Sequence, residues 1–238
     1  MKLAIMQPYF FPYIGYFQLI DAVDHFLIFD DVQYIERGWI HRNRILLNNE
    51  PAYINLPIKK APRDTLINQR ELAAHEMPRY KDKIIGQLQA TYKKSPHYQA
   101  VVSLVETVLS YPETNVALFL QQAIKVVCDY LSITTTIGLS SSVKIENPEV
   151  RGQDRIIALC KAMQADHYIN SIGGQSLYTT SEFAQQGIEL HFIKMSEITY
   201  QQPAPDFVPH LSIIDVMMCN EPTHIKKMLG QYELIKSH

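Results

Sequence analysis

Cysteine, excess charge and long apolar segments are all scarce in this sequence of 238 residues. The three cysteines, Cys128, Cys160 and Cys219, lie in apolar runs, form no CxxC pair and have no histidine nearby at ligand spacing. This pattern weighs against a zinc site and favours buried free thiols in a reducing compartment. We therefore expect free thiols and no metal centre.

The scarcity of charge and of long apolar runs narrows the possible partners. The formal net charge is −2, so the overall charge does not favour nucleic acid or an anionic membrane surface. No apolar stretch reaches the roughly 18–20 residues that span a bilayer. The opening MKLAIMQPYFFP has too short an apolar run for a signal peptide. We expect a cytoplasmic protein without membrane insertion whose partner is a small molecule, and the oligomeric state stays open.

What the sequence does contain is a strand, turn, helix and strand at its start. Leu3–Met6 is an apolar run typical of a strand buried on both faces, and Gln7-Pro8 ends it. Pro12 can open the helix that follows, and His25–Phe29 predicts a second strand. Because open α/β sheets bind ligands at the carboxyl ends of their strands, this turn is the first candidate for a site. Its substrate-binding candidates are Gln7, Tyr9, Tyr13, Gly15 and Tyr16. The alternative is that the aromatic residues only cap the core.

A β-hairpin is predicted after the second strand. Short strands are expected at 33–35, 44–47 and 52–57, and Asn48-Asn49 is a turn signal because asparagine tolerates a left-handed backbone. From residue 78 to 131 the apolar spacing becomes helical, and prolines punctuate it. We therefore expect a hairpin insertion followed by a helical block.

The segment from Glu36 to Arg44, which leads into the second of these strands, concentrates three arginines, one histidine and the only tryptophan. Arginine forks match the geometry of phosphate and carboxylate, and tryptophan can stack on a ring. We interpret the segment as an anion-holding lobe that faces the opening turn. Its substrate-binding candidates are Arg37, Trp39, Arg42, Asn43 and Arg44. The alternative is a solvated hairpin whose arginines pair with Asp30, Asp31 and Glu36.

Further candidates follow a later strand, expected at 167–170. Two glycines directly after a strand can expose backbone N–H groups to an anion, although a lone Gly-Gly is neither a GxGxxG nor a Walker motif. The candidates here are Ser171, Gly173, Gly174 and Gln175. For Arg155, at the start of the preceding helix, we favour pairing within that helix. Asp215 lies on an otherwise apolar helix at 211–218, so it either pairs with an arginine or lines the site, because burial of an unpaired carboxylate is costly.

These patterns predict an α/β fold with a mainly parallel open sheet, of nucleotidylyltransferase or Rossmann type, a β-hairpin insertion and a helical block. We expect one domain over residues 1–238. The sheet portion is expected at 1–60 and 133–200, the helical portion at 78–131, and C-terminal helices at 211–236, where Asn220 caps the last helix.

Four blocks of the sequence carry a resemblance to a known family. They read MQPYFFPYIGYFQLIDAVDHFLIFDDVQY, RGWIHRNRI, DRIIALCKAMQADHYINSIGGQSLY and FVPHLSIIDVMM. Together they resemble the WbqC-like family over nearly the whole chain. The resemblance implies a role in bacterial O-antigen and other surface-polysaccharide gene clusters, and a glycine (aminoacyl) transferase activity. It implies no catalytic residues, so the site candidates rest on the residues alone.

The opening turn is also similar in layout to that of nucleotidylyltransferase-like folds. There the turn carries HxGH, whose histidines stabilise a triphosphate during adenylyl transfer. This chain has Tyr13 and Tyr16 where histidines would be wanted. Because a neutral tyrosine cannot supply the positive charge of an imidazolium, adenylyl transfer is disfavoured.

Three functions remain open. The first is transfer of an aminoacyl group, such as glycyl, to the amine of a nucleotide-linked amino sugar, with His41, Asp30 or Asp31 as the base. No nucleophile motif is present, so the acyl group would arrive activated, through ATP or as a thioester or aminoacyl-tRNA. The second is a non-catalytic protein that binds the nucleotide sugar. The third is a metal-independent glycosyltransferase, because a clear DxD motif is missing.

Overall fold

The structure is a computed structural model that describes residues 1–236. Its main sheet has six strands: β1 (Lys2–Met6), β2 (His25–Ile28), β5 (Thr136–Leu139), β6 (His167–Ser171), β7 (Glu189–Met195) and β8 (Tyr232–Lys236). Their order across the sheet is β5-β2-β1-β6-β7-β8. All neighbouring strands pair in parallel except β8, which runs antiparallel to β7. The predicted mainly parallel α/β sheet is confirmed.

The predicted hairpin forms a separate two-stranded antiparallel sheet of β3 (Arg42–Leu47) and β4 (Glu50–Asn55). The helical block is also present, as α2 (Met77–Tyr92), α3 (Tyr98–Leu109) and α4 (Val116–Tyr130). The other helices are α1 (Ile14–Asp21), α5 (Gly152–Ala162), α6 (Thr180–Gln185), α7 (Ile213–Cys219) and α8 (Pro222–Leu229).

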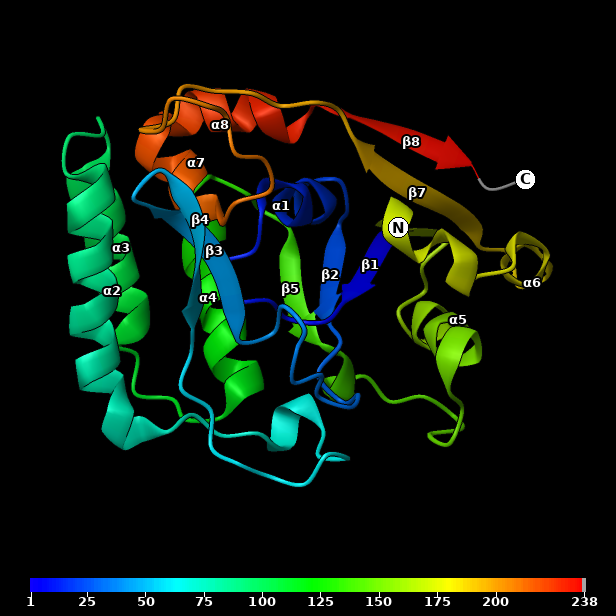
Figure 1. Cartoon of the computed structure of the whole chain (residues 1–238). Coiled ribbons are helices and arrows are strands. Elements are labelled where there is room, and N and C mark those ends of the chain that lie inside the picture. Colours follow the sequence, from blue (N-terminus) through cyan, green and yellow to red (C-terminus); the bar gives the residue numbers. More distant parts are fainter. Residues whose placement is uncertain (237–238) are drawn as a thin grey trace.

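Helices cover both faces of the main sheet (Figure 1), which is why its central strands are apolar on both sides. Ala4 and Phe26 face a core that α1, α2, α3, α4, α7, α8 and the hairpin complete. Leu3, Ile5 and Leu27 face a second core, shared with α5 and α6. Adjacent residues of β1 thus serve opposite cores, as the alternation of side chains along a strand requires.

The strand order places a topological switch point between β1 and β6. From β1 the chain crosses through α1 to β2 on one side, whereas from β6 it crosses through α6 to β7 on the other. The connections therefore diverge at the carboxyl ends of β1 and β6. In doubly wound sheets this divergence leaves the crevice in which ligands bind.

Three local predictions are wrong. Gln33 makes only an isolated bridge to Leu66, and no strand forms at 33–35. Asn220 ends α7, where its side chain donates to the Val216 carbonyl at 2.9 Å, and Glu221 precedes α8 instead. The last described residues, expected to be helical, form β8, because the free edge of β7 offers backbone partners that a local pattern does not reveal.

The thiols lie where the sequence indicated. Cys128 and Cys160 are buried, Cys219 is partly buried, and all three are free. Burial raises the pKa of each thiol to about 12, so the reactive thiolate is disfavoured. Within residues 1–236, no group of three or more His, Cys, Asp and Glu side chains is placed to hold a metal ion. No helix in the same range combines the length and apolar character that crossing a membrane requires.

The hairpin turn provides a test of local backbone preference. Asn48 and Asn49 adopt φ values of 54° and 66°, in the left-handed region where a Cβ is unfavourable unless the side chain bonds locally. We expect Asn49→Ala to lower the free energy of unfolding by about 1 kcal/mol, and Asn49→Gly to leave it nearly unchanged. Urea denaturation measures both, with the exposed neighbour Glu50→Ala as the control. Equal effects of the alanine and glycine variants would contradict this account.

Candidate functional site

A cavity of about 560 Å³ lies at the switch point of the sheet. Its walls come from the turn after β1, the start of α1, the hairpin, the carboxyl ends of β6 and β7, and the segment before α7. The lining residues are Tyr9, Pro12, Tyr13, Gly15, Gln18, Trp39, Asn43, Arg44, Ser171, Ile172, Gly173, Ile193, Lys194, Met195 and His210. The opening turn and the arginine-rich segment therefore share one cavity.

The structure divides the substrate-binding candidates into two groups. Those that line the cavity are Tyr9, Tyr13, Gly15, Trp39, Asn43, Arg44, Ser171 and Gly173. Those outside its lining are Gln7, Tyr16, Arg37, Arg42, Gly174, Gln175 and Asp215. The three candidate bases, His41, Asp30 and Asp31, also lie outside the lining.

The turn after β1 is held in an uncommon conformation by the side chain of Asn43. Phe11 has a φ of 41°, which costs a bulky residue roughly 1–3 kcal/mol. The buried Asn43 amide donates from Nδ2 to the carbonyls of Phe10 at 3.1 Å and Phe11 at 2.7 Å. Ser212 adds a bond from its hydroxyl to the Phe11 carbonyl at 2.8 Å. These bonds offset the strain and fix where Tyr9 and Tyr13 emerge.

The aromatic wall of the cavity depends on a close approach at Gly15. A Cβ at this position would lie 2.4 Å from Cε2 of Tyr13, so a side chain would displace the ring. Burial raises the pKa of both Tyr9 and Tyr13, and for Tyr9 the nearby Tyr13 adds to the effect. Their hydroxyls therefore stay protonated and can donate to a ligand. Tyr16 instead packs in the core, where its hydroxyl donates to the Gln7 carbonyl at 2.9 Å.

The cavity carries positive charge without a compensating carboxylate. Arg44 and Lys194 line it together with His210, and no Asp or Glu of residues 1–236 does. Arg44 forms no ion pair within that range. Its Nη2 donates only to the His210 carbonyl at 3.4 Å, and its buried Nε has no partner in the described chain. Its Cζ lies 5.7 Å from the centroid of the Trp39 ring. An anion bound here would meet cations whose charge no acid of the site neutralises.

Arg42 and Arg37 lie outside the cavity lining and contact other parts of the chain. Arg42 donates from Nε to the Gly38 carbonyl at 3.0 Å and from Nη2 to the Arg37 carbonyl, and its Cζ lies 4.9 Å from the centroid of the Tyr53 ring. It therefore ties down the loop that carries Trp39. Arg37 lines a separate surface hollow with Arg63.

His41 is turned away from the cavity and into a bond with Tyr34. The Tyr34 hydroxyl lies 2.6 Å from Nδ1 of His41. Burial lowers the pKa of His41, and the nearby Arg42 and Arg70 lower it further. The imidazole is thus held neutral within a local cluster outside the lining.

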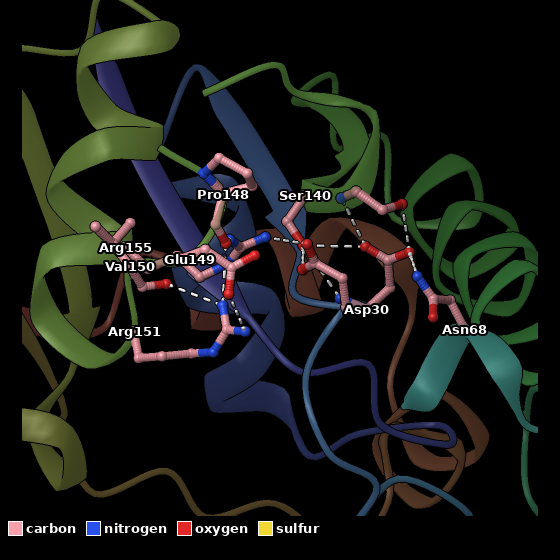
Figure 2. A network of polar contacts seen from close by, with 10 residues as sticks. Asp30, Asn68, Ser140, Pro148, Glu149, Val150, Arg151 and Arg155 are labelled. Atoms are coloured by element: carbon pink, nitrogen blue, oxygen red, sulfur yellow. Dashed lines mark hydrogen bonds and ion pairs between the residues drawn. The ribbon is translucent and has the colours of Figure 1, made fainter. Parts of the chain in front are cut away.

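Asp30 and Asp31 form a polar network that joins the carboxyl ends of β2 and β5. Figure 2 shows Asp30 with Ser140 and Asn68 in this network. The buried Asp30 carboxylate accepts from the Ser140 hydroxyl, the Ser141 N–H and hydroxyl, and Asn68 Nδ2, at 2.6–3.2 Å. Asp31 shares the single proton of the Ser140 hydroxyl with Asp30 and pairs with Arg155. The expectation that Arg155 pairs within its own helix is therefore wrong. The Arg155–Asp31 pair links α5 to the carboxyl end of β2, and the network gives both carboxylates hydrogen-bond or ion-pair partners.

Asp215 is buried, and neither expectation for it holds, because its partners are two tyrosines and a glutamine. Its carboxylate accepts from the hydroxyls of Tyr92 and Tyr200, each at 2.6 Å, and from Gln202 Nε2 at 2.8 Å. Burial raises its pKa, and the three donors oppose that rise. Gln202 also accepts from the Val208 N–H at 2.7 Å. Asp215 therefore anchors the segment of residues 196–212, which brings His210 to the cavity.

Sequence reasoning missed three polar residues of the cavity. Lys194 is the last residue but one of β7, so the rule that singled out the ends of β1 and β6 would have found it. His210 sits in an irregular segment with a φ of 56°, an unusual conformation for a histidine. Gln18 is fully buried on α1 and donates to the Met228 and Gln231 carbonyls, and its Oε1 has no partner within residues 1–236. No local pattern indicated the last two.

The fold is a doubly wound α/β fold with a cavity at its switch point, which is where sheets of this kind commonly bind ligands. A family model described as the WbqC-like protein family matches residues 7–227, and the chain belongs to this family. It is similar to Rv1507c, an uncharacterised protein of Mycobacterium tuberculosis. The two are 28% identical over 225 residues, which cover 91% of this chain and 92% of that protein. No solved structure matches the chain.

The Asn43 side chain provides a test of how the site is held. Asn43→Asp preserves the shape but removes the N–H donors to Phe10 and Phe11, and it places a charge in a buried position. We expect the free energy of unfolding to fall by about 1–3 kcal/mol or more in urea denaturation. Asn55→Ala, an exposed position on the paired strand, is the control and should change it by less than about 0.5 kcal/mol. Similar effects of the two variants would show that the hydrogen bonds of Asn43 do not contribute to the free energy of unfolding.

Proposed function

We propose that the cavity binds a nucleotide-linked amino sugar and that the protein transfers an aminoacyl group, such as glycyl, to the sugar amine. The observation that carries this proposal is the combination of Arg44 and Lys194 with the exposed ring of Trp39 and no carboxylate of residues 1–236 in the cavity lining. A diphosphate suits the cations, and a base or sugar ring suits Trp39. The unpartnered Oε1 of Gln18 suits a hydroxyl or amine of the sugar.

The same charges favour the chemistry of acyl transfer. Cations near an ammonium lower its pKa, so Arg44 and Lys194 favour the free amine of a bound sugar. The amine nitrogen then attacks the acyl carbonyl carbon, a C–N bond forms, and the bond to the leaving group of the donor breaks with the electron pair. His210 accepts the proton that the nitrogen loses. The protonated Tyr13 hydroxyl can donate to the oxygen that becomes negative.

Family membership supports the setting of the proposal. The setting that we propose is bacterial O-antigen or other surface-polysaccharide biosynthesis, with the transferase in the cytoplasm. The donor would arrive already activated, through ATP or as a thioester or aminoacyl-tRNA, because the described cavity lining contains no cysteine.

One observation favours a second candidate, a protein that binds the nucleotide sugar without turnover. All three bases expected from the sequence lie outside the cavity lining, and Asp30 and Asp31 are occupied by internal bonds. The same observation weakens the glycosyltransferase alternative, for which Asp30-Asp31 was the remaining support. A catalytic role therefore depends on His210.

A mass measurement separates these functions. Purified protein is incubated with nucleotide-linked amino sugars, glycine and ATP, and separately with preformed aminoacyl thioesters. A product heavier than the sugar by one aminoacyl group supports the transferase. A new glycoside supports the glycosyltransferase. Binding of the nucleotide sugar without turnover by any donor supports the binding protein.

Lys194→Ala tests whether the positive charge of the cavity contributes to the binding of a nucleotide sugar. The side chain is exposed and forms no ion pair within residues 1–236, so its loss should leave the melting temperature nearly unchanged. We expect the Kd for a nucleotide sugar to rise about tenfold in calorimetry, since a charge-assisted bond contributes about 1.5–3 kcal/mol. Lys83→Ala on α2, also exposed, is the matched control. An unchanged Kd for Lys194→Ala would place the diphosphate elsewhere.

The role of His210 is tested by His210→Asn, because asparagine tolerates the positive φ of this position. Loss of a general base typically costs 10²- to 10⁴-fold in rate. We expect kcat to fall by at least about 10²-fold while the Kd for the nucleotide sugar changes less than threefold. A comparable fall in affinity with kcat preserved would make His210 a binding residue only.

A further inference from the structure

A second cavity, of about 490 Å³, adjoins the first. Three residues line both, namely Tyr13, Met195 and His210. The rings of Tyr13 and His210 meet edge to face, with centroids 6.1 Å apart and planes 79° apart. This ring pair therefore forms the border between the two cavities, and the proposed base stands at the border.

The second cavity has the opposite charge character. Glu197 is the one carboxylate of residues 1–236 that lines it, and no lysine or arginine of that range does. Tyr200 and Phe207 contribute an aromatic corner, with ring centroids 5.2 Å apart and planes 85° apart. A carboxylate beside aromatic faces attracts organic cations, through its charge and through cation–π contacts with the rings. The remaining wall is mostly aliphatic, from Ile14, Ile198, Leu211 and Val216.

The aromatic corner is held in place from behind. The Tyr200 hydroxyl donates to the buried Asp215 carboxylate at 2.6 Å, which fixes the ring that faces the cavity. The Val208 N–H donates to Gln202 Oε1 and thereby holds the backbone next to Phe207. Such preorganised walls reduce the entropy that the protein loses when a ligand binds.

We propose that this second cavity binds the aminoacyl part of the donor. The α-ammonium lies beside Glu197 and the rings of Tyr200 and Phe207, the side chain packs on the aliphatic wall, and the carbonyl carbon points to the Tyr13–His210 border. There the amine from the first cavity forms the C–N bond, the leaving group departs with the electron pair, and His210 takes the proton. The inference rests on the proposed function for this step, whereas ammonium binding is measured independently.

The size of the cavity bears on the choice of amino acid. A glycyl group has only four heavy atoms, whereas this volume lies in the range of pockets that hold much larger ligands. The aliphatic wall would leave a glycyl group with no side chain to bury there. The geometry therefore favours an aminoacyl group with an apolar side chain over glycyl.

Binding of leucinamide, a small ammonium with an apolar side chain, tests the inference. We expect leucinamide to bind the full chain with a Kd of about a millimolar in NMR titration, and glycinamide and neutral N-acetyl-leucinamide to bind at least about tenfold more weakly. Glu197→Gln should weaken leucinamide binding about tenfold. Glu146→Gln, an exposed residue outside both cavities, is the matched control and should leave it unchanged.

The outcomes separate this inference from the proposed function. Leucinamide binding that resists Glu197→Gln, or equal binding of the N-acetylated probe, would overturn the second cavity as an ammonium site. Nucleotide-sugar binding is titrated in parallel, and Glu197→Gln should leave its Kd unchanged because Glu197 lies outside the first cavity. A chain that binds leucinamide in this manner but no nucleotide sugar would refute the proposed function alone.

Discussion

The amide of Asn43 is the contact on which the candidate site depends. It joins the hairpin to the turn after β1 by donating to two consecutive carbonyls, Phe10 and Phe11, and its own Oδ1 accepts from the Arg44 N–H at 2.8 Å. One buried side chain thus sets the direction of both the aromatic wall and the arginine. The backbone of Phe11 is strained because its φ lies in the left-handed region. Without these bonds the turn would relax to a more favourable conformation, and the aromatic wall would move.

A second buried anchor positions the opposite wall. Asp215 binds Tyr92 from the helical block together with Tyr200 and Gln202 from the segment before α7. That segment has no regular secondary structure from residue 197 to 212. Side-chain hydrogen bonds therefore hold it in place, as backbone hydrogen bonds do in a helix or sheet. The Ser212 N–H donates to the Arg44 carbonyl at 2.8 Å and thereby links the two anchors. The cavity is consequently enclosed by pieces that are distant in sequence and fixed by polar contacts.

These contacts explain which predictions from the sequence succeeded. The parallel strands, the helical block and the hairpin follow from local periodicity and turn residues, and the structure confirms them. The expectation that the turn after the first strand and the arginine-rich segment face each other agrees with Tyr13 and Arg44, which line one cavity. The partners of Asp30, Asp31 and Asp215 could not be predicted, because most of them lie about 110 residues or more away in the chain, as Ser140 and Tyr92 do. His210 had no signal at all, since its position depends on the Asp215 anchor.

Under the proposed function, the distribution of charge decides where proton transfer takes place. The cationic cavity holds no acid of residues 1–236, and the second cavity holds no lysine or arginine of that range. A proton acceptor that serves both must stand where they meet, and His210 is the titratable side chain shared by both linings besides Tyr13, whose hydroxyl burial keeps protonated. Two arginines of the arginine-rich segment, Arg37 and Arg42, line neither cavity. Under the proposed function, reactivity therefore follows from the meeting of two environments of opposite charge rather than from the density of charged residues along the chain.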